Sequence, residues 1–339
     1  MNIFEQRSAD IQPVWFMRQA GRYHWHYQGF RKKHAFMELC KNPELACEVT
    51  LGPIEDFKFN AAIMFSDLLF PLEQMNLGLH YNDGPPKLET YLSDVEQYKK
   101  VKIIEPAKTF YTFQSDTCSL LKEKLPKDVS LLGFVGAPFT LYTYATEGGH
   151  KGSLIPSKTG LYDGRWQMFL DILLPNLMEN ISMQLNAGAD AICLFDTAVG
   201  ELGFEDYMRF IKPVINQIAD DVKAKHPDKK IIYYTKQTHL RFLENLEAKS
   251  IDVLGIDWRI DIIDALKSLG NDYYVQGNID PVWLHLKWED LKANLEKYKA
   301  KFKDYPELKK KWIAGLGHGV LVKTPEENVR RAVEFIQGI

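Results

Sequence analysis

Short, uninterrupted apolar runs recur along the chain, and amphipathic stretches separate them. An apolar run without polar interruption is typical of a strand that is buried on both faces of a parallel sheet. Eight such runs occur, and most of them end in a polar or glycine-rich segment. The predicted strands cover residues 13–17, 61–65, 130–135, 191–195, 230–234, 253–256, 273–275 and 312–314.

Helical periodicity fills most of the intervals between these runs. Within residues 31–59, Asn42 suits the cap of a helix and Pro43 suits its first position. Residues 77–87, which include Gly84-Pro85-Pro86, predict a small hairpin or covering loop. The further predicted helices cover residues 167–186, 204–224, 239–248, 260–269, 288–299 and 325–336.

Strands that alternate with helices in this way favour one fold class. Eight strands over 339 residues are typical of an α/β chain folded as a (β/α)8 barrel rather than as a doubly wound sheet. No stretch has the Pro, Gly or Ser content of a linker. We therefore expect residues 1–339 to form a single TIM-barrel domain, with its cleft at the carboxyl ends of the strands.

Net charge, cysteine content and apolar runs indicate which binding partners and which compartment to expect. The net charge of -3 gives no footprint for nucleic acid or an anionic membrane. The residues Cys40, Cys47, Cys118 and Cys193 contain no C-x-x-C pair and predict buried, reduced thiols. The segment Met1–Arg7 lacks the apolar core of a signal peptide, and no apolar run is long enough to span a bilayer. We expect a soluble, cytoplasmic protein.

Chemically useful groups follow nearly every predicted strand. In a barrel these tips share one surface, so eight together favour an active site, although a single polar tip is usually an ordinary loop. The tips are Arg18 with Gln19 and Arg22, Ser66-Asp67, residues 136–140, Asp196-Thr197, Lys236-Gln237, residues 257–259, Gly277-Asn278 with Asp280, and Gly317-His318-Gly319.

The charges at these tips suggest a ligand. Arg18, Arg22 and Arg31 form a cationic side that suits carboxylates. Asp67 would repel an anionic ligand unless it meets a part that is rich in N–H groups. The combination predicts a substrate with an anionic rim and a hydrogen-bond-donating centre. Alternatively, Asp67 caps the turn that follows it.

Two further candidates stay open on sequence alone. His318 lies between two glycines, so its backbone can approach a ligand closely and its imidazole can bind a carboxylate or transfer a proton. The alternative is a buried, structural histidine. Near Gly148-Gly149, the phenols of Tyr142 and Tyr144 are equally plausible carboxylate ligands.

Five motifs occur in order over almost the whole chain: Pro13-Val-Trp-Phe-Met-Arg-Gln-Ala-Gly-Arg-Tyr23, Phe65-Ser-Asp67, Gly133-Phe-Val-Gly-Ala-Pro-Phe-Thr-Leu141, Gln276-Gly-Asn-Ile-Asp-Pro281 and Gly317-His-Gly319. Read together, these segments resemble the uroporphyrinogen decarboxylase family. Two segments depart from the family pattern: His24-Trp25-His26 stands where Leu-Pro-Glu is usual, and Gly315 stands where asparagine is common.

The resemblance implies a homodimeric barrel that works without metal or cofactor. It would remove CO2 from the four acetate side chains of uroporphyrinogen III, through partially decarboxylated intermediates, in porphyrin and haem biosynthesis. The implied catalytic residues are Asp67, Arg18, Tyr144 and His318. The predicted substrate-binding set adds Gln19, Arg22, Arg31 and Thr197 to these four.

The implied chemistry agrees with the charge layout. Loss of CO2 needs an electron sink, which a pyrrole provides once a proton has added to its ring carbon. Asp67 beneath the ring N–H groups would stabilise that cation more than the neutral ground state. Arg18 with a bound water and His318 compete as the proton donor.

Three alternative functions share parts of this pattern. A zinc-dependent corrinoid methyltransferase of the same fold would need a His-x-Cys motif, but the chain has His239-Leu-Arg241 and no cysteine after Cys193. The motif His24-Trp-His26 suggests a metal-dependent barrel hydrolase, yet no matching aspartate ends the last strand. A non-catalytic tetrapyrrole binder would not need Asp67 beneath the rings.

Overall fold

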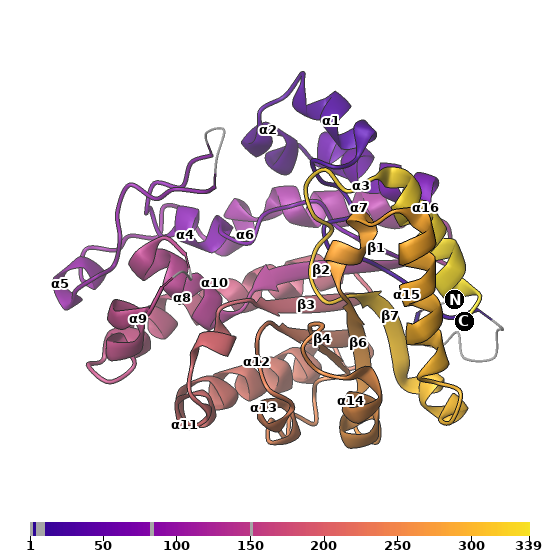
Figure 1. Ribbon diagram of the computed structural model, residues 1–339. Helices are drawn as coiled ribbons and strands as arrows, with labels where there is room; N and C mark the ends of the chain where they lie inside the picture. Colours follow the sequence, from indigo (N-terminus) through magenta and orange to yellow (C-terminus); the bar gives the residue numbers. More distant parts are fainter. Residues whose placement is uncertain (1–2, 5–10, 82–84, 150–151) are drawn as a thin grey trace.

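One parallel sheet organises the chain (Figure 1). The computed structural model describes residues 3–4, 11–81, 85–149 and 152–339. Strands β1 to β7 lie in sequence order, and each neighbouring pair is parallel. They are β1 (Ala61–Ile63), β2 (Ser130–Gly136), β3 (Ala191–Asp196), β4 (Lys230–Thr235), β5 (Val253–Gly255), β6 (Tyr274–Ile279) and β7 (Trp312–Leu316).

The first predicted strand, residues 13–17, takes the position between β7 and β1. Val14 pairs in parallel with Ala314 of β7. The Trp15 N–H donates to the Ala314 carbonyl over 3.1 Å, and the Asn60 N–H donates to the Val14 carbonyl over 3.0 Å. The sheet therefore closes through an extended segment with a single bridge, where the sequence predicted an eighth regular strand. This closure makes the fold a (β/α)8 barrel.

Helices surround the sheet on its outside (Figure 1). Short 3₁₀ turns lie at Val199–Glu201, Pro281–His285 and Pro306–Lys311. The α-helices are α1 (Trp25–Arg31), α2 (Phe36–Lys41), α3 (Pro43–Phe57), α4 (Phe70–Gln74), α5 (Val95–Tyr98), α6 (Ala107–Phe110), α7 (Thr112–Lys124), α8 (Pro138–Glu147), α9 (Ile155–Gly160), α10 (Arg165–Asn186), α11 (Phe204–Asp206), α12 (Lys212–Lys225), α13 (Leu240–Glu244), α14 (Ile262–Leu269), α15 (Trp288–Ala300) and α16 (Glu326–Gln337).

The predicted helices are found with shifted ends. Asn42 caps α3, because its side-chain oxygen accepts from the Leu45 N–H over 2.9 Å. The helix predicted over residues 204–224 is divided into α11, a π-helical turn at Tyr207–Ile211, and α12. The helical stretch predicted over residues 31–59 is likewise divided, into α2 and α3. Helices α7 and α8 lie where the sequence predicted none, and α8 is buried on nearly every side and so lacks an amphipathic pattern.

The segment 77–87 is a hairpin, as one of the two sequence interpretations proposed. His80 and Lys87 exchange a pair of backbone hydrogen bonds, each 3.0 Å long. Gly84, on which part of that prediction rested, lies outside the described residues, as do Met1, Asn2 and residues 5–10 of the amino-terminal segment.

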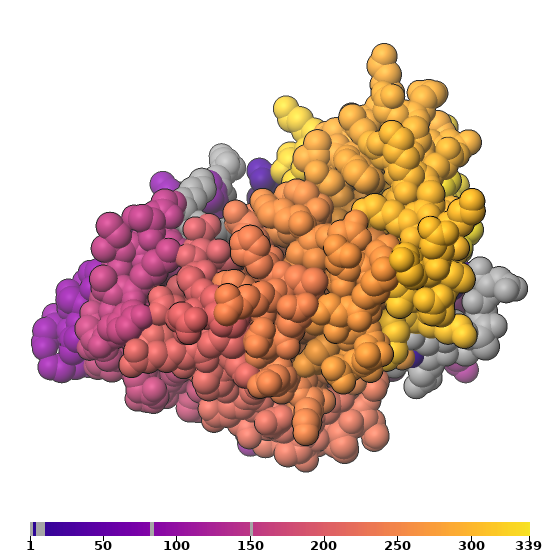
Figure 2. Space-filling view, turned by 60° about the horizontal axis from the view of Figure 1, so that its bottom comes forward, coloured from indigo at the N-terminus to yellow at the C-terminus, as the bar shows by residue number. Residues whose placement is uncertain are grey.

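Two of the apolar clusters among the described residues hold the barrel together. One fills its interior with inward side chains such as Trp15, Phe134 and Ile313, and the other lies between the sheet and the helices. All four cysteines are buried and unpaired, as predicted. In the space-filling view of Figure 2, residues from the second half of the chain form most of the visible outer face. Within the described part of the chain, no helix combines the length and apolarity needed to cross a bilayer.

Candidate active site

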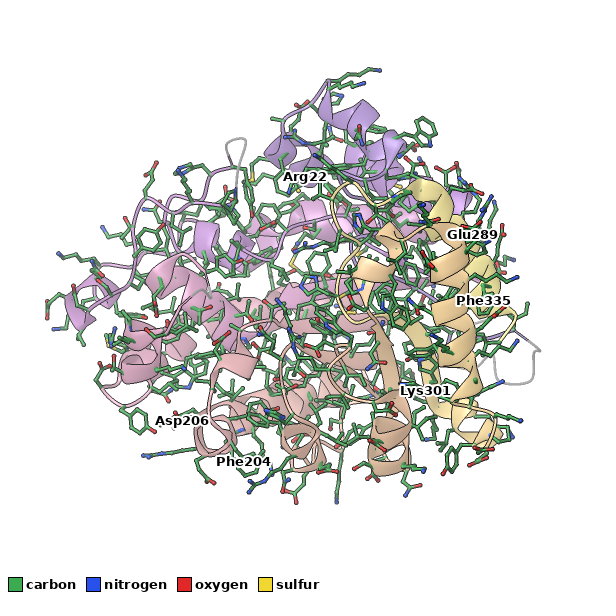
Figure 3. The ribbon with its side chains drawn as sticks, viewed as in Figure 1. Arg22, Phe204, Asp206, Glu289, Lys301 and Phe335 are labelled. Atoms are coloured by element: carbon green, nitrogen blue, oxygen red, sulfur yellow. The ribbon has the colours of Figure 1, made fainter. Side chains whose placement is uncertain are left out.

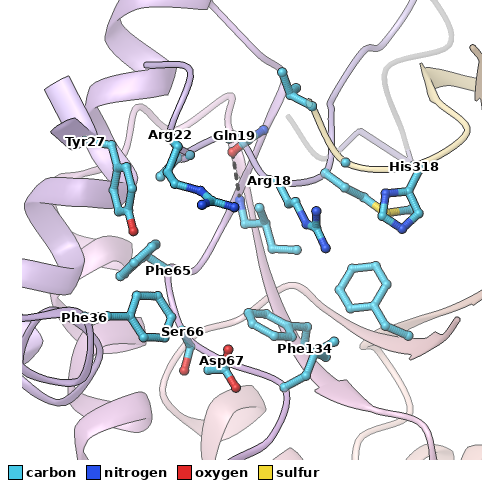
Figure 4. A pocket seen from close by; sticks show the side chains of 18 of the residues that line it. Arg18, Gln19, Arg22, Tyr27, Phe36, Phe65, Ser66, Asp67, Phe134 and His318 are labelled. Carbon is cyan, nitrogen blue, oxygen red and sulfur yellow. Dashed lines mark hydrogen bonds between the residues drawn. The ribbon is translucent and has the colours of Figure 1, made fainter. Parts of the chain in front are cut away.

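A cavity of about 720 Å³ opens at the carboxyl ends of the strands. It is lined by the loop after residues 13–17, the segment after β1, the hairpin, α8 and the segments after β3 and β7. Figure 4 shows side chains from several of these elements turned towards one space. All eight site residues predicted from the sequence line this cavity: Arg18, Gln19, Arg22, Arg31, Asp67, Tyr144, Thr197 and His318.

Arg18 is held in a costly backbone conformation. Its φ of 56° lies in the left-handed region, which costs a residue with a side chain about 1–2 kcal/mol. Gly319 makes room for its stem, since a Cβ at position 319 would lie 2.5 Å from the Arg18 Cδ and 3.0 Å from its Cβ. The sequence predicted that the glycines around His318 let a ligand approach the backbone. In the structure, the space beside Gly319 is instead filled by the Arg18 side chain. Gly317 likewise faces the Trp258 backbone.

Gln19 anchors the arginine loop to β1. Its amide Nε2 donates to the Ala61 carbonyl over 2.7 Å, and its Oε1 accepts from the Ile63 N–H over 3.1 Å. Figure 4 shows one of these bonds as a dashed line. Its backbone carbonyl accepts from the Tyr23 hydroxyl over 2.7 Å. The amide thus fixes the loop that carries Arg18 and Arg22, and direct binding of substrate by Gln19 stays a prediction.

The arginines supply the cationic side of the cavity. Neither Arg18 nor Arg22 forms an ion pair within 4.0 Å with the described residues, although the charge of Arg18 acts on the Asp67 carboxyl across the cavity. Arg31 donates from Nη1 to the His34 carbonyl over 2.6 Å. Figure 3 places Arg22 near α1 and α2, far from Lys301 on the α15 side of the molecule.

Asp67 follows β1 and lies at the edge of the cavity shown in Figure 4. Its Oδ1 accepts from the Leu69 N–H over 2.8 Å, so the predicted turn-capping role is real and leaves further acceptor capacity. Burial raises the pKa of this carboxyl, while the Tyr81 hydroxyl, the Leu69 N–H and Arg18 oppose that rise. The carboxylate is therefore held in a partly desolvated site, where its field acts strongly on a ligand.

The structure distinguishes the two candidate tyrosines. Tyr144 lines the cavity, and burial together with the nearby Asp67 carboxylate raises its pKa. Tyr142 is fully buried among Trp166 and Phe169, with ring centroids 5.2 and 5.3 Å away. Only Tyr144 is placed to meet a ligand.

His318 lies beside Arg18 at the end of β7 (Figure 4). Its ring meets the Tyr234 ring edge-on at 6.3 Å, and the Tyr234 hydroxyl donates to the Gly317 carbonyl over 2.7 Å. These contacts fix the turn that presents the imidazole to the cavity.

An aromatic wall was missed by the sequence reasoning. Phe36 packs against Phe65 and Tyr81 with ring centroids 6.0 and 4.6 Å apart, and Tyr27 lies 5.5 Å from Phe65. All four rings line the cavity, although they come from four separate segments. Such rings suit the apolar faces of a macrocycle. No local pattern brings these segments together, so only the tertiary fold reveals the wall.

The metal-dependent alternatives find no support in the side-chain placement. His24 is fully buried outside the cavity and its Nε2 contacts Asp56 Oδ2 at 2.7 Å. None of the four cysteines lines the cavity, and neither does His239. Within the described residues, no three His, Cys, Asp or Glu side chains come together in a way that could hold a metal ion.

The fold and site together define a class: a (β/α)8-barrel enzyme whose cavity is lined by arginines and by the half-buried Asp67 carboxylate. The particular family follows from comparison with known proteins. The uroporphyrinogen decarboxylase (URO-D) family model matches residues 1–339, and the chain belongs to this family.

Curated relatives agree over nearly full length. Uroporphyrinogen decarboxylase of Carboxydothermus hydrogenoformans is 36% identical over 334 residues, covering 98% of this chain and 93% of the relative. The enzyme of that name from Prochlorococcus marinus (strain MIT 9215) is 34% identical, covering 97% and 94%.

Solved structures support the fold. A methyltransferase from Methanosarcina mazei superposes with a TM-score of 0.68 at 16% identity, covering 99% of this chain and 98% of that one. A B12-independent methionine synthase from Shewanella sp. W3-18-1 gives a TM-score of 0.59 at 11% identity, covering 96% and 94%. At such low identity the likeness concerns the barrel alone.

Proposed function

We propose that this chain converts uroporphyrinogen III to coproporphyrinogen III by removing CO2 from four acetate side chains, a carboxy-lyase step in porphyrin and haem biosynthesis. Family membership and the names of its curated relatives support the reaction. The observation that carries the proposal is one carboxylate, Asp67, set in a cavity whose cationic side holds Arg18 and Arg22.

This charge layout matches the substrate. Uroporphyrinogen has carboxylates around its rim and four pyrrole N–H groups at its centre. Arginines grip carboxylates through paired hydrogen bonds, so Arg18, Arg22 and Arg31 hold the rim. Asp67 accepts from the central N–H groups, and the aromatic wall contacts the apolar edge of the macrocycle.

Each decarboxylation then follows one sequence of bond changes. A proton adds to the pyrrole carbon beside the acetate-bearing carbon and makes the ring a cation. The bond between the acetate methylene and its carboxylate breaks, CO2 leaves, and the electron pair neutralises the ring. The exocyclic methylene takes up a proton to become a methyl group, and the added ring proton is lost.

Asp67 lowers the barrier by favouring the cationic stage. Its negative charge interacts more strongly with the protonated ring than with the neutral substrate, which is the condition for catalysis. Arg18 and His318 lie on the same side of the cavity (Figure 4). Arg18, acting through a bound water, and His318 are the two candidate proton donors. Tyr144 and Thr197 complete the proposed contacts with the substrate.

Three further properties belong to the proposal. Residues 1–339 act as one catalytic domain, supported by the single sheet that spans the described chain. The protein works as a homodimer, supported by its family resemblance. It acts in the cytoplasm, supported by its four unpaired cysteines, which a reducing compartment would preserve.

The direct test is anaerobic incubation of chelator-treated protein with uroporphyrinogen III, followed by separation of the oxidised products by carboxylate number. We expect stepwise conversion from eight carboxylates to four. Tight binding without release of CO2 would instead identify a tetrapyrrole binder. Activity that requires added zinc would contradict the metal-free mechanism.

A further inference from the structure

Tyr81 reaches the cavity from the hairpin, and no sequence motif pointed to it. Its hydroxyl oxygen is buried and has no hydrogen-bond partner of standard geometry within the described part of the chain. Leaving a buried hydroxyl unpaired costs about 1–3 kcal/mol. A nearby acceptor that takes up this hydroxyl hydrogen would remove the cost.

Asp67 lines the same cavity and is a nearby acceptor for this hydroxyl. The two groups influence each other, since the hydroxyl lowers the pKa of Asp67 and the carboxylate raises the pKa of Tyr81. Burial is the larger cause of the rise at Tyr81, so the phenol keeps its proton and acts only as a donor. Leu69 already donates its N–H to Asp67 Oδ1, so a second donor would leave the carboxylate with a fixed orientation.

The ring of Tyr81 is held independently of this contact. Phe36 of α2 packs against it with ring centroids 4.6 Å apart. The paired backbone of His80 and Lys87 fixes the base of the hairpin. A phenylalanine at position 81 would keep these contacts, so the hydroxyl can be removed without removing the ring.

We propose that Tyr81 is a positioning residue: its hydroxyl donates a hydrogen bond to Asp67 and keeps that carboxylate ionised and aimed at the ring N–H groups of the substrate. The inference rests on the proposed function for its catalytic consequence. Tyr81 acts through Asp67 and does not itself take part in proton transfer.

The charges around Asp67 decide how much the hydroxyl matters. Arg18 favours the ionised carboxylate from the cavity loop, whereas Glu73 of α4 opposes it. Tyr144 on α8 and the buried thiol of Cys40 on α2 also face this carboxylate, and both have a raised pKa. Arg18 therefore lowers the pKa of Asp67, whereas burial and Glu73 raise it. Loss of the Tyr81 hydroxyl as a donor should move the titration of Asp67 to higher pH.

The test compares Tyr81→Phe with Tyr98→Phe. Tyr98 is a matched control because its hydroxyl is also buried without a partner of standard geometry, but it lies outside the cavity. The first readout is the carboxyl titration of Asp67 in the substrate-free protein, followed by carbon NMR and assigned with Asp67→Asn. We expect the midpoint to move to higher pH in Tyr81→Phe and to stay unchanged in Tyr98→Phe.

The second readout is the pH profile of kcat/KM with uroporphyrinogen III. In Tyr81→Phe the acid limb should move to higher pH, and kcat should fall roughly tenfold, the scale of one hydrogen bond to a charged group. An unchanged titration midpoint would overturn the inference, as would a loss confined to KM, which would make Tyr81 a substrate ligand. If wild-type protein releases no CO2, the proposed function fails, yet the substrate-free titration still tests the contact.

Discussion

Two carboxylates, Asp67 in the segment after β1 and Asp196 at the end of β3, have different surroundings. Asp196 is fully buried, and both its oxygens accept from protein hydroxyls: Thr140 Oγ1 at 2.8 Å and the Tyr233 hydroxyl at 3.2 Å. Asp67 accepts one backbone N–H and otherwise faces the cavity. Burial raises the pKa of both carboxyls, to about 7 at Asp196. A raised pKa therefore does not mark the site by itself, but acceptor capacity left towards a cavity does.

The largest expected difference between the two is catalytic. Asp67→Asn should lower kcat with uroporphyrinogen III by about 10²–10³-fold, because a preorganised charge beside the cationic intermediate is lost. Asp196→Asn should stay within a few-fold of wild type, because its side chain does not line the cavity. Steady-state rates of the two purified variants measure this contrast. Similar losses of kcat in the two variants would contradict the distinction between a catalytic Asp67 and a structural Asp196.

The sequence placed both carboxylates after predicted strands. The charge layout and the family resemblance singled out Asp67, whereas strand spacing alone does not separate the two. Side chains alternate between the two faces of a strand, so one position decides between cavity and wall. Phe195 points into the barrel, and Asp196 therefore turns outwards to Tyr233, which belongs to the layer between sheet and helices. The order of strands and helices follows from local patterns, which made the barrel predictable.

Other features depend on contacts between distant segments. Gln19 was predicted as a ligand from its place in the arginine loop, but only the fold shows its amide bonded to β1. The wall of Tyr27, Phe36, Phe65 and Tyr81 likewise joins segments whose proximity no local spacing encodes.

A second, smaller effect tests how the cavity charges are placed. Gly319→Ala would put a Cβ 2.5 Å from the Arg18 Cδ, so the guanidinium opposite Asp67 must shift. We expect kcat/KM to fall by about 10–100-fold, in line with the cost of misplacing a binding group by about 1 Å. Gly29→Ala is the control, since a Cβ there meets nothing within 4 Å. Equal activity of the two variants would show that Arg18 tolerates displacement.

The smallest expected effect is on protein stability, and it concerns Asp196 alone. Its pKa is raised from 3.8 to about 7 in the folded protein, so its stabilising contribution is fully present below about pH 3.8 and is lost as pH rises through 7. Asp196→Asn should remove this loss, which amounts to at most about 4 kcal/mol. Denaturant unfolding at pH 5 and pH 8 checks the sign. A variant that loses more stability than wild type between these values would contradict it.

The central claim is that Asp67 stabilises the protonated intermediate and contributes little to the binding of substrate. Anaerobic measurement of both the Kd for uroporphyrinogen III and the single-turnover rate of CO2 release in Asp67→Ala tests it most directly. We predict a rate that is lower by about two to three powers of ten, with a Kd that changes by less than about tenfold. Losses of equal size in affinity and rate would show that Asp67 only binds substrate and would contradict the account.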